Sequence, residues 1–180
     1  MGMAEMTQDD WYDLIEEGTL EQGDILFQCP VSVLVSDTLP SSDEEEIEVD
    51  LLTLNVVVMT QSCDLANGKT PDVVLCALWN AEEAISQGVN MGQKNTLAEI
   101  KKGRRPRYVL LNKSTLLNTP LSLCIADCGK VFSLPLAYVQ DAARRQGPRL
   151  RLRSPYREHL SQAFAQYFMR VGLPKDIDLP

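Results

Sequence analysis

One hydrophobic run limits the folds that this chain can adopt. Residues 51–59 read Leu-Leu-Thr-Leu-Asn-Val-Val-Val-Met, so apolar side chains occupy both alternating sets of positions. Because neighbouring side chains of a strand point to opposite faces, such a run is typical of a strand covered on both sides, in the centre of a sheet or the wall of a barrel. The run is shorter than the ~20 apolar residues of a membrane span. We therefore expect a soluble, non-membrane domain built around this strand.

Other short apolar segments supply the rest of an antiparallel sheet. The expected strands are residues 25–27, 31–35, 72–79, 107–111, 121–126, 130–134 and 149–153. Asp127-Cys128-Gly129 favours a hairpin turn between the segments 121–126 and 130–134. So many short strands in 180 residues predict a small, strongly bent β-barrel or sheet within an α+β fold.

Helices are expected at both ends of the chain and in one insertion. Thr7 can cap an N-terminal helix that carries Trp11, Leu14 and Ile15 on one face and ends at Gly18. A helical pair is expected in residues 80–103, with Asn80 as the cap of its first helix. The C-terminal helix is expected over residues 154–172, with Ser154 as cap and Pro155 in the first turn.

Residues 37–50 are expected to be an acidic surface loop, because Asp43 and the glutamates after it repel one another and cannot enter a core. The whole chain, residues 1–180, is expected to form a single domain.

Charge is divided unequally along the sequence. Residues 1–100 carry 20 acidic and 2 basic side chains, whereas residues 101–180 carry 5 acidic and 15 basic ones. The simplest interpretation is that the two halves attract each other within one fold, because a compact domain brings opposite charges together at little cost. The net charge of −8 argues against a protein that coats DNA, although a local basic patch is compatible with it.

Two basic groups are candidate binding residues. The first group is Lys101, Lys102, Arg104, Arg105 and Arg107, and the second is Arg149, Arg151 and Arg153. In the second group arginine alternates with leucine, so we expect the leucines to face inward and the arginines outward. These cations could hold the phosphates of RNA, pair with the acidic half of the chain, or dock an acidic protein. A protein partner is the preferred interpretation.

A polar segment directly follows the hydrophobic run. Gln61, Ser62, Cys63 and Asp64 are candidate site residues, because a strand end can hold exposed groups rigidly. Cys63 could act as a nucleophile with the single histidine, His159, as base. Against this, a neighbouring carboxylate raises the pKa of a thiol. The simpler interpretation is that Gln61, Ser62 and Asp64 hydrogen-bond the following turn while Cys63 packs in the core.

Cysteine usage predicts neither disulfides nor a metal. The five cysteines form no Cys-x-x-Cys pair, and only Cys124 and Cys128 lie close in sequence. We expect reduced thiols, no cofactor and a cytoplasmic protein, since the acidic N-terminus also lacks the apolar core of a secretory signal.

Two motifs carry a resemblance to known proteins. Met59 to Leu65 resembles a Gln-Ser-Cys-Asp-Leu motif of small bacterial proteins of unassigned role, and Gly23-Asp24-Ile25 is similar to the opening of the MazF/PemK toxin class. This resemblance implies a PemK-type, SH3-like barrel, and in that class the barrel is an mRNA-cleaving ribonuclease or, in relatives, a gyrase inhibitor. The chain lacks the Arg-Pro pair that those toxins carry just before the Val-rich strand, and it has Trp79-Asn80 where they carry Ser or Thr after the second strand.

These observations together predict a non-enzymatic regulatory or accessory protein that binds a protein partner. The resemblance places it in a bacterial stress or phage-defence operon, of the CRISPR or toxin–antitoxin kind. One alternative is an RNA-binding or RNA-cleaving protein, with Arg104, Arg105 and Arg107 on phosphates. Another is a cysteine-dependent activity at Cys63. The sequence does not indicate an oligomeric state.

Overall fold

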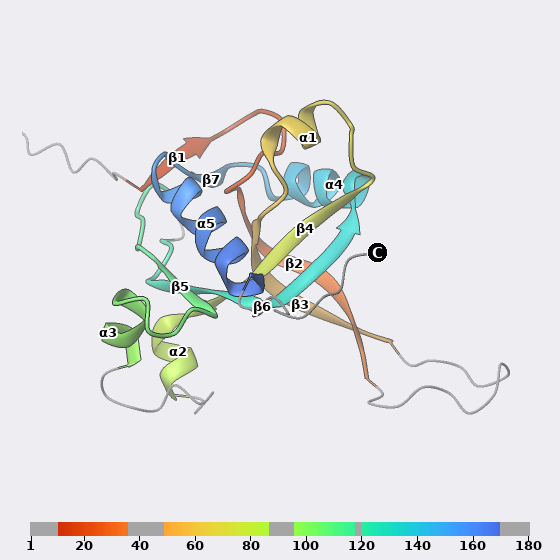
Figure 1. The fold of residues 1–180 in the computed structure, drawn as a ribbon. Helices are drawn as coiled ribbons and strands as arrows, with labels where there is room; N and C mark the ends of the chain where they lie inside the picture. Colours follow the sequence, from red (N-terminus) through yellow and green to blue (C-terminus); the bar gives the residue numbers. More distant parts are fainter. Residues whose placement is uncertain (1–10, 36–48, 87–95, 118–119, 170–180) are drawn as a thin grey trace, which may run out of the picture.

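Strand pairing divides the chain into two antiparallel sheets (Figure 1). The computed structural model describes residues 11–35, 49–86, 96–117 and 120–169. The larger sheet has the order β2 (Ile25–Leu34), β3 (Val49–Val58), β4 (Asp72–Asn80), β6 (Cys124–Pro135) and β5 (Tyr108–Leu111). The smaller sheet pairs β1 (Tyr12–Ile15) with β7 (Arg149–Leu152). The predicted α+β fold with an antiparallel sheet is confirmed.

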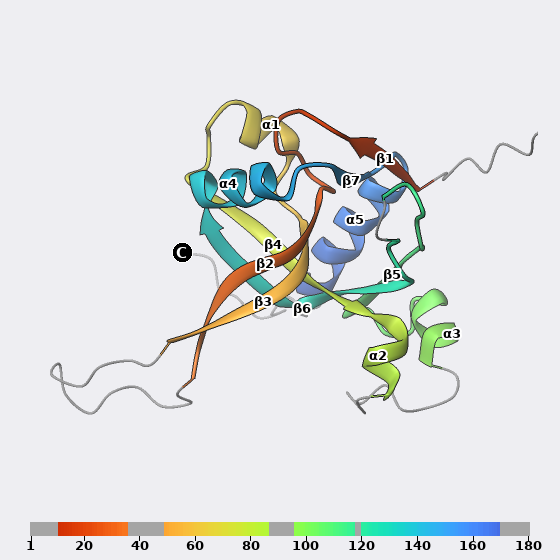
Figure 2. The same ribbon diagram turned by 180° about the vertical axis from the view of Figure 1, so that it is seen from behind.

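Five helices accompany the sheets in the described residues. They are α1 (Ser62–Ala66), α2 (Ala81–Ser86), α3 (Thr96–Lys101), α4 (Leu136–Gln146) and α5 (Tyr156–Phe168). In Figure 1 α5 lies in front of the larger sheet, and in the reverse view of Figure 2 α4 lies in front. The two helices therefore cover opposite faces. Val139 of α4 packs in one apolar cluster and Leu160 of α5 in another.

The hydrophobic run forms β3, as predicted, but only its second half is buried on both faces. Val56, Val57 and Val58 are fully buried, whereas Leu51 is 72% exposed. The first half of β3 pairs with β2 alone, while the second half lies between β2 and β4. Of the predicted acidic loop 37–50, residues 37–48 lie outside the described residues, and Val49 and Asp50 belong to β3.

The predicted N-terminal helix is wrong where the structure describes it. Tyr12–Ile15 is a strand, because its backbone pairs with β7, and the buried Tyr12 contacts the core through that pairing. In so short a segment, pairing with β7 determines the conformation more strongly than the helical spacing of the apolar residues does. The earlier part of the predicted helix, residues 7–10, lies outside the described residues.

The predicted hairpin at residues 127–129 is also wrong. Cys124–Pro135 is one strand, and both of its halves pair with β4. The register shifts between Cys76 and Ala77, whose partners are Val131 and Asp127, so Cys128, Gly129 and Lys130 form a bulge. Turn-forming residues here serve a β-bulge, which has a similar composition.

The described residues form no closed or curled barrel. β2 and β5 lie at opposite edges of the larger sheet, and an isolated bridge between Asp24 and Arg151 joins it to the smaller one. The predicted helical insertion corresponds to α2 and α3, with residues 87–95 outside the described ranges. The C-terminal helix is observed as α5, and its cap position is Pro155 rather than Ser154. Within these ranges we find no helix of a length and hydropathy suited to crossing a membrane.

Candidate functional site

The polar segment after β3 forms the single helical turn α1. Ser62 Oγ accepts a hydrogen bond from the Gln22 amide at 3.1 Å, and Gln22 Nε2 donates to the Met59 carbonyl at 2.7 Å. Leu65, the last residue of the motif, is buried in the core cluster beneath α4. These bonds fix the chain as it leaves the sheet. The arrangement explains most of the motif through folding alone.

Cys63 is exposed, contrary to the expectation that it packs in the core. Its Sγ lies 3.7 Å from Gln61 Oε1 and 3.7 Å from Asp64 Oδ1, so its neighbours are an amide and a carboxylate. His159 is an exposed residue of α5, and no contact between its ring and Cys63 occurs in the described residues. The structure therefore does not bring together the thiol and base of the predicted pair.

The arginines of β7 lie in an internal network, not on an outer face. Arg149, only 3% exposed, donates to Asp24 Oδ2 at 2.7 Å and to the carbonyls of Gly18 and Thr19. Arg151 donates to both carboxylate oxygens of Asp24 and to Glu21 Oε1 at 2.6 Å. The expectation that these arginines point outward is wrong, because the fully buried Asp24 accepts both.

Gly23, which directly precedes Asp24, lets the backbone adopt the conformation that this network requires. Its φ is +86°, a conformation that favours glycine, and an added Cβ would lie 3.1 Å from Leu152 Cβ. The backbone can thus approach β7 closely enough for Asp24 to reach the arginines. Arg153, the third basic residue of the group, lies 3.4 Å from Asp13 and is partly exposed. The second basic group is therefore largely neutralised by residues 13–24.

Arg107 is tied down by the bulge of β6. It forms a two-pronged ion pair with Asp127 at 2.7 and 2.9 Å, and the amide of Gly129 donates to the same carboxylate. Hydrogen bonding to Asp127 raises the pKa of Arg107 further. A Cβ at Gly129 would lie 2.7 Å from Arg107 Nε, so glycine makes room for the guanidinium. Arg107 therefore has a structural partner.

The remaining cations of the first group surround the end of α3. Arg104 pairs with Glu99 at 3.0 Å, and both side chains are partly exposed. Lys101, Lys102 and Arg105 form no ion pair with any described residue. The structure thus separates the eight predicted cations into five that have carboxylate partners and three that do not.

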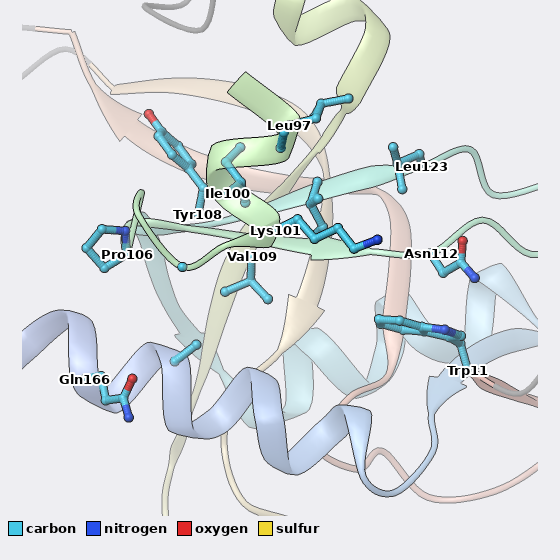
Figure 3. A pocket seen from close by; sticks show the side chains of 14 residues that line it. Trp11, Leu97, Ile100, Lys101, Pro106, Tyr108, Val109, Asn112, Leu123 and Gln166 are labelled. Carbon is cyan, nitrogen blue, oxygen red and sulfur yellow. The ribbon is translucent and has the colours of Figure 1, made fainter. Parts of the chain in front are cut away.

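A groove of about 720 Å³ opens beside Lys101, which is the one of these three cations that lines it. It lies between α3, β5 and α5, and its lining is mainly apolar (Figure 3). Trp11 and Asn112 stand at one end, while Pro106 and Tyr108 stand at the other. The Lys101 side chain extends along the groove toward Asn112. The groove therefore joins apolar contact to the positive charge of Lys101.

The apolar part of this groove was not predicted from the sequence. Its lining comes from five separate segments of the chain, including Trp11, Leu97, Val109, Leu123 and Ala163. Only the basic residues beside it gave a signal, because they are consecutive. Periodicity assigns an apolar residue to a buried face, but it does not show where two faces fail to meet.

The buried thiols offer no metal site. Cys29, Cys76, Cys124 and Cys128 are buried, and burial raises the pKa of Cys124 to about 11. The thiol of Cys76 donates a hydrogen bond to Cys128, and this bond together with burial raises the pKa of Cys76. In the described part of the chain no cluster of three or more His, Cys, Asp and Glu side chains could hold a metal ion.

No protein-family model matches this chain, and no curated protein matches it either.

Proposed function

We propose that this chain is a non-enzymatic binding protein whose groove between α3, β5 and α5 receives a segment of a protein partner. The observation that carries this proposal is the groove itself, a mainly apolar cavity of about 720 Å³ lined in part by Lys101, which has no carboxylate partner in the described residues. Exposed apolar surface rimmed by charge is characteristic of protein interaction sites. Arg and Lys at the rim give such a site its preference for acidic partners.

The two alternatives have less support. An RNA-binding site would need a cluster of unpaired cations, yet Arg107, Arg149 and Arg151 are held by Asp127 and Asp24. Of the eight predicted binding cations, only Lys101, Lys102 and Arg105 have no carboxylate partner among the described residues, and they lack the row of stacked aromatics that single-stranded RNA favours. A cysteine-dependent activity would need a base beside Cys63, whose side-chain partners are an amide and a carboxylate.

The finer predictions accompany this proposal. A relation to the MazF/PemK class and a place in a bacterial stress or phage-defence operon stay predictions. What supports the relation is chain order: β2 after Gly23-Asp24, then β3, β4 and a helix near the C-terminus. An accessory role is compatible with such an operon, because function depends on the site and not on the fold.

Two alanines of α5 provide a matched test. Ala163 lines the groove, whereas Ala165 is an exposed position outside it. The full chain and the variants Ala163→Glu and Ala165→Glu would each be immobilised and exposed to nuclease-treated lysate of the native host. We expect a partner retained by the parent and by Ala165→Glu, and reduced at least about tenfold with Ala163→Glu.

Two results would overturn the proposal. One is that no retained protein distinguishes Ala163→Glu from Ala165→Glu. The other is that retention occurs only before nuclease treatment, which would favour the RNA alternative. Circular dichroism of both variants would confirm that the α5 substitutions leave the fold intact.

A further inference from the structure

The groove runs along an edge of the larger sheet. β5 pairs with β6 on one side, and no described strand pairs with its other side. Lining residues come from both faces of the sheet: Leu97 and Ile100 belong to the cluster around α2 and α3, while Val109 packs with the cluster beneath α5. The cavity therefore surrounds the free edge of β5 and does not lie on one face.

Register shows which backbone groups of β5 face outward. The Cys128 amide donates to the Arg107 carbonyl at 2.8 Å, which makes these residues a hydrogen-bonded pair in the β5–β6 ladder. In an antiparallel ladder every second pair is hydrogen-bonded, so Val109 and Leu111 also bond to β6. The polar backbone groups of Tyr108, Leu110 and Asn112 consequently point away from β6.

The neighbouring ladder gives the same assignment. The Ala81 amide donates to the Leu123 carbonyl at 2.9 Å, in register with β4 and β6. By alternation Ile125 bonds to β4, which leaves Ala126 and Cys124 to bond Val109 and Leu111. Two independent hydrogen bonds therefore agree on the outward set.

Part of the outward set already has partners. The Tyr108 amide donates to the Arg105 carbonyl at 2.9 Å, and the Asn112 carbonyl accepts from Tyr12 Oη at 2.7 Å. As far as the described residues go, the groups left to the groove are the carbonyl of Tyr108, both groups of Leu110 and the amide of Asn112. Unpaired strand edges with this pattern are templates for another strand.

We infer that the groove binds an extended peptide segment, with acidic residues, that adds a strand to the free edge of β5. The inference rests on the proposed function and names the conformation and chemistry of the partner. Alternate side chains of the added strand would face Leu97 and Ile100 on one side and Ala163 on the other. Lys101, which lines the groove and extends along it, provides the charge complement for its carboxylates.

The test begins with a phage-displayed library of random twelve-residue peptides, selected on the full chain and counter-selected on Ala163→Glu. We expect enriched peptides in which apolar residues recur at every second position and Asp or Glu stands beside them. Binding of the best synthetic peptide should weaken with added salt, because part of the attraction is between exposed charges.

N-methylation of the peptide backbone then tests whether the bound peptide forms a strand that hydrogen-bonds to β5. Methylating an amide that faces β5 removes a hydrogen bond and should weaken binding about tenfold, whereas methylating the adjacent amide should change it little. Alternation of strong and weak effects along the peptide supports the added strand. The matched control is the same methylation series measured on Ala165→Glu, which should bind the peptide as the parent does and show the same alternation.

Other outcomes separate this inference from the proposed function. Groove-dependent peptides with apolar residues at helical spacing and no alternating N-methyl effect would overturn the added strand and leave the protein-binding function standing. Selection of no groove-dependent peptide would overturn the strand as well, while a partner retained from lysate would still support the function. If neither a groove-dependent peptide nor a retained partner were found, both the added strand and the protein-binding function would be overturned.

Discussion

Two basic regions of this molecule differ in whether carboxylates neutralise their side chains. On β7, Arg149 and Arg151 are drawn into the interior by Asp24, whereas at the end of α3, Lys102 and Arg105 form no ion pair with a described residue. The sequence makes these regions look alike, since both are short basic stretches. The difference lies in what packs beside them: β7 runs along the acidic start of the chain, and α3 precedes a free sheet edge. A basic stretch is available to a partner only where the fold supplies no carboxylate.

The largest predicted effect is at Asp24, where the internal region can be broken. Asp24→Asn leaves the buried Arg149 without a carboxylate and Arg151 with Glu21 alone, and removing one member of a buried ion pair costs about 3–5 kcal/mol of unfolding free energy. Urea unfolding would measure the loss. Asp141→Asn is the control, because its pairs with Arg144 and Arg145 are exposed and contribute about 0.2–1 kcal/mol. Equal losses in the two variants would contradict the contrast.

Asp127 is an intermediate case between the two regions. The carboxylate is buried, but its partner Arg107 is 45% exposed and can regain water when the pair is broken. Asp127→Asn should therefore cost about 1–3 kcal/mol, the usual penalty for weakening buried hydrogen bonds. The same unfolding experiment measures it. A loss as large as that of Asp24→Asn would mean that exposure of the partner does not decide the cost.

This contrast also shows how far the sequence could be interpreted. The buried half of β3 was predictable, because a strand apolar on both faces has few other places in a fold. Tyr12–Ile15 was not, since its conformation depends on β7, which lies more than a hundred residues away. The inward position of Arg149 was not predictable for the same reason. Alternation shows which side chains share a face of a strand, but it does not show that a carboxylate, here that of Asp24, is buried beside one face.

The candidate site was predictable only in part. The basic residues near Lys101 stood out because they are consecutive, while the apolar lining beside them comes from distant segments. Gln61 to Asp64 attracted attention as a chemical motif, yet Ser62 serves mainly to hold the loop of Gln22. Polar residues at a strand end are needed for folding as well as for function, and sequence spacing does not separate these roles.

A smaller effect is expected at Glu99, the carboxylate that lies among the cations of α3. Its pair with Arg104 is exposed, so Glu99→Gln should cost no more than about 0.2–1 kcal/mol. The cost should shrink further in high salt, which screens exposed charges. Urea unfolding at low and high salt checks both points. A salt-independent cost well above this range would place Glu99 in a buried network like that of Asp24.

The smallest effect is predicted for Lys102 and Arg105, the two cations that follow α3. Lys102→Gln and Arg105→Gln should each change the unfolding free energy by no more than about 0.5 kcal/mol, because neither side chain has an ion pair to lose in the described residues. Arg151→Gln, measured beside them, should cost several times more, since it removes bonds to Asp24 and Glu21. A loss above about 1 kcal/mol at Arg105 would show that the fold already uses this cation. Arg105 would then resemble the arginines of β7, and its charge would be neutralised within the molecule and not available to a partner.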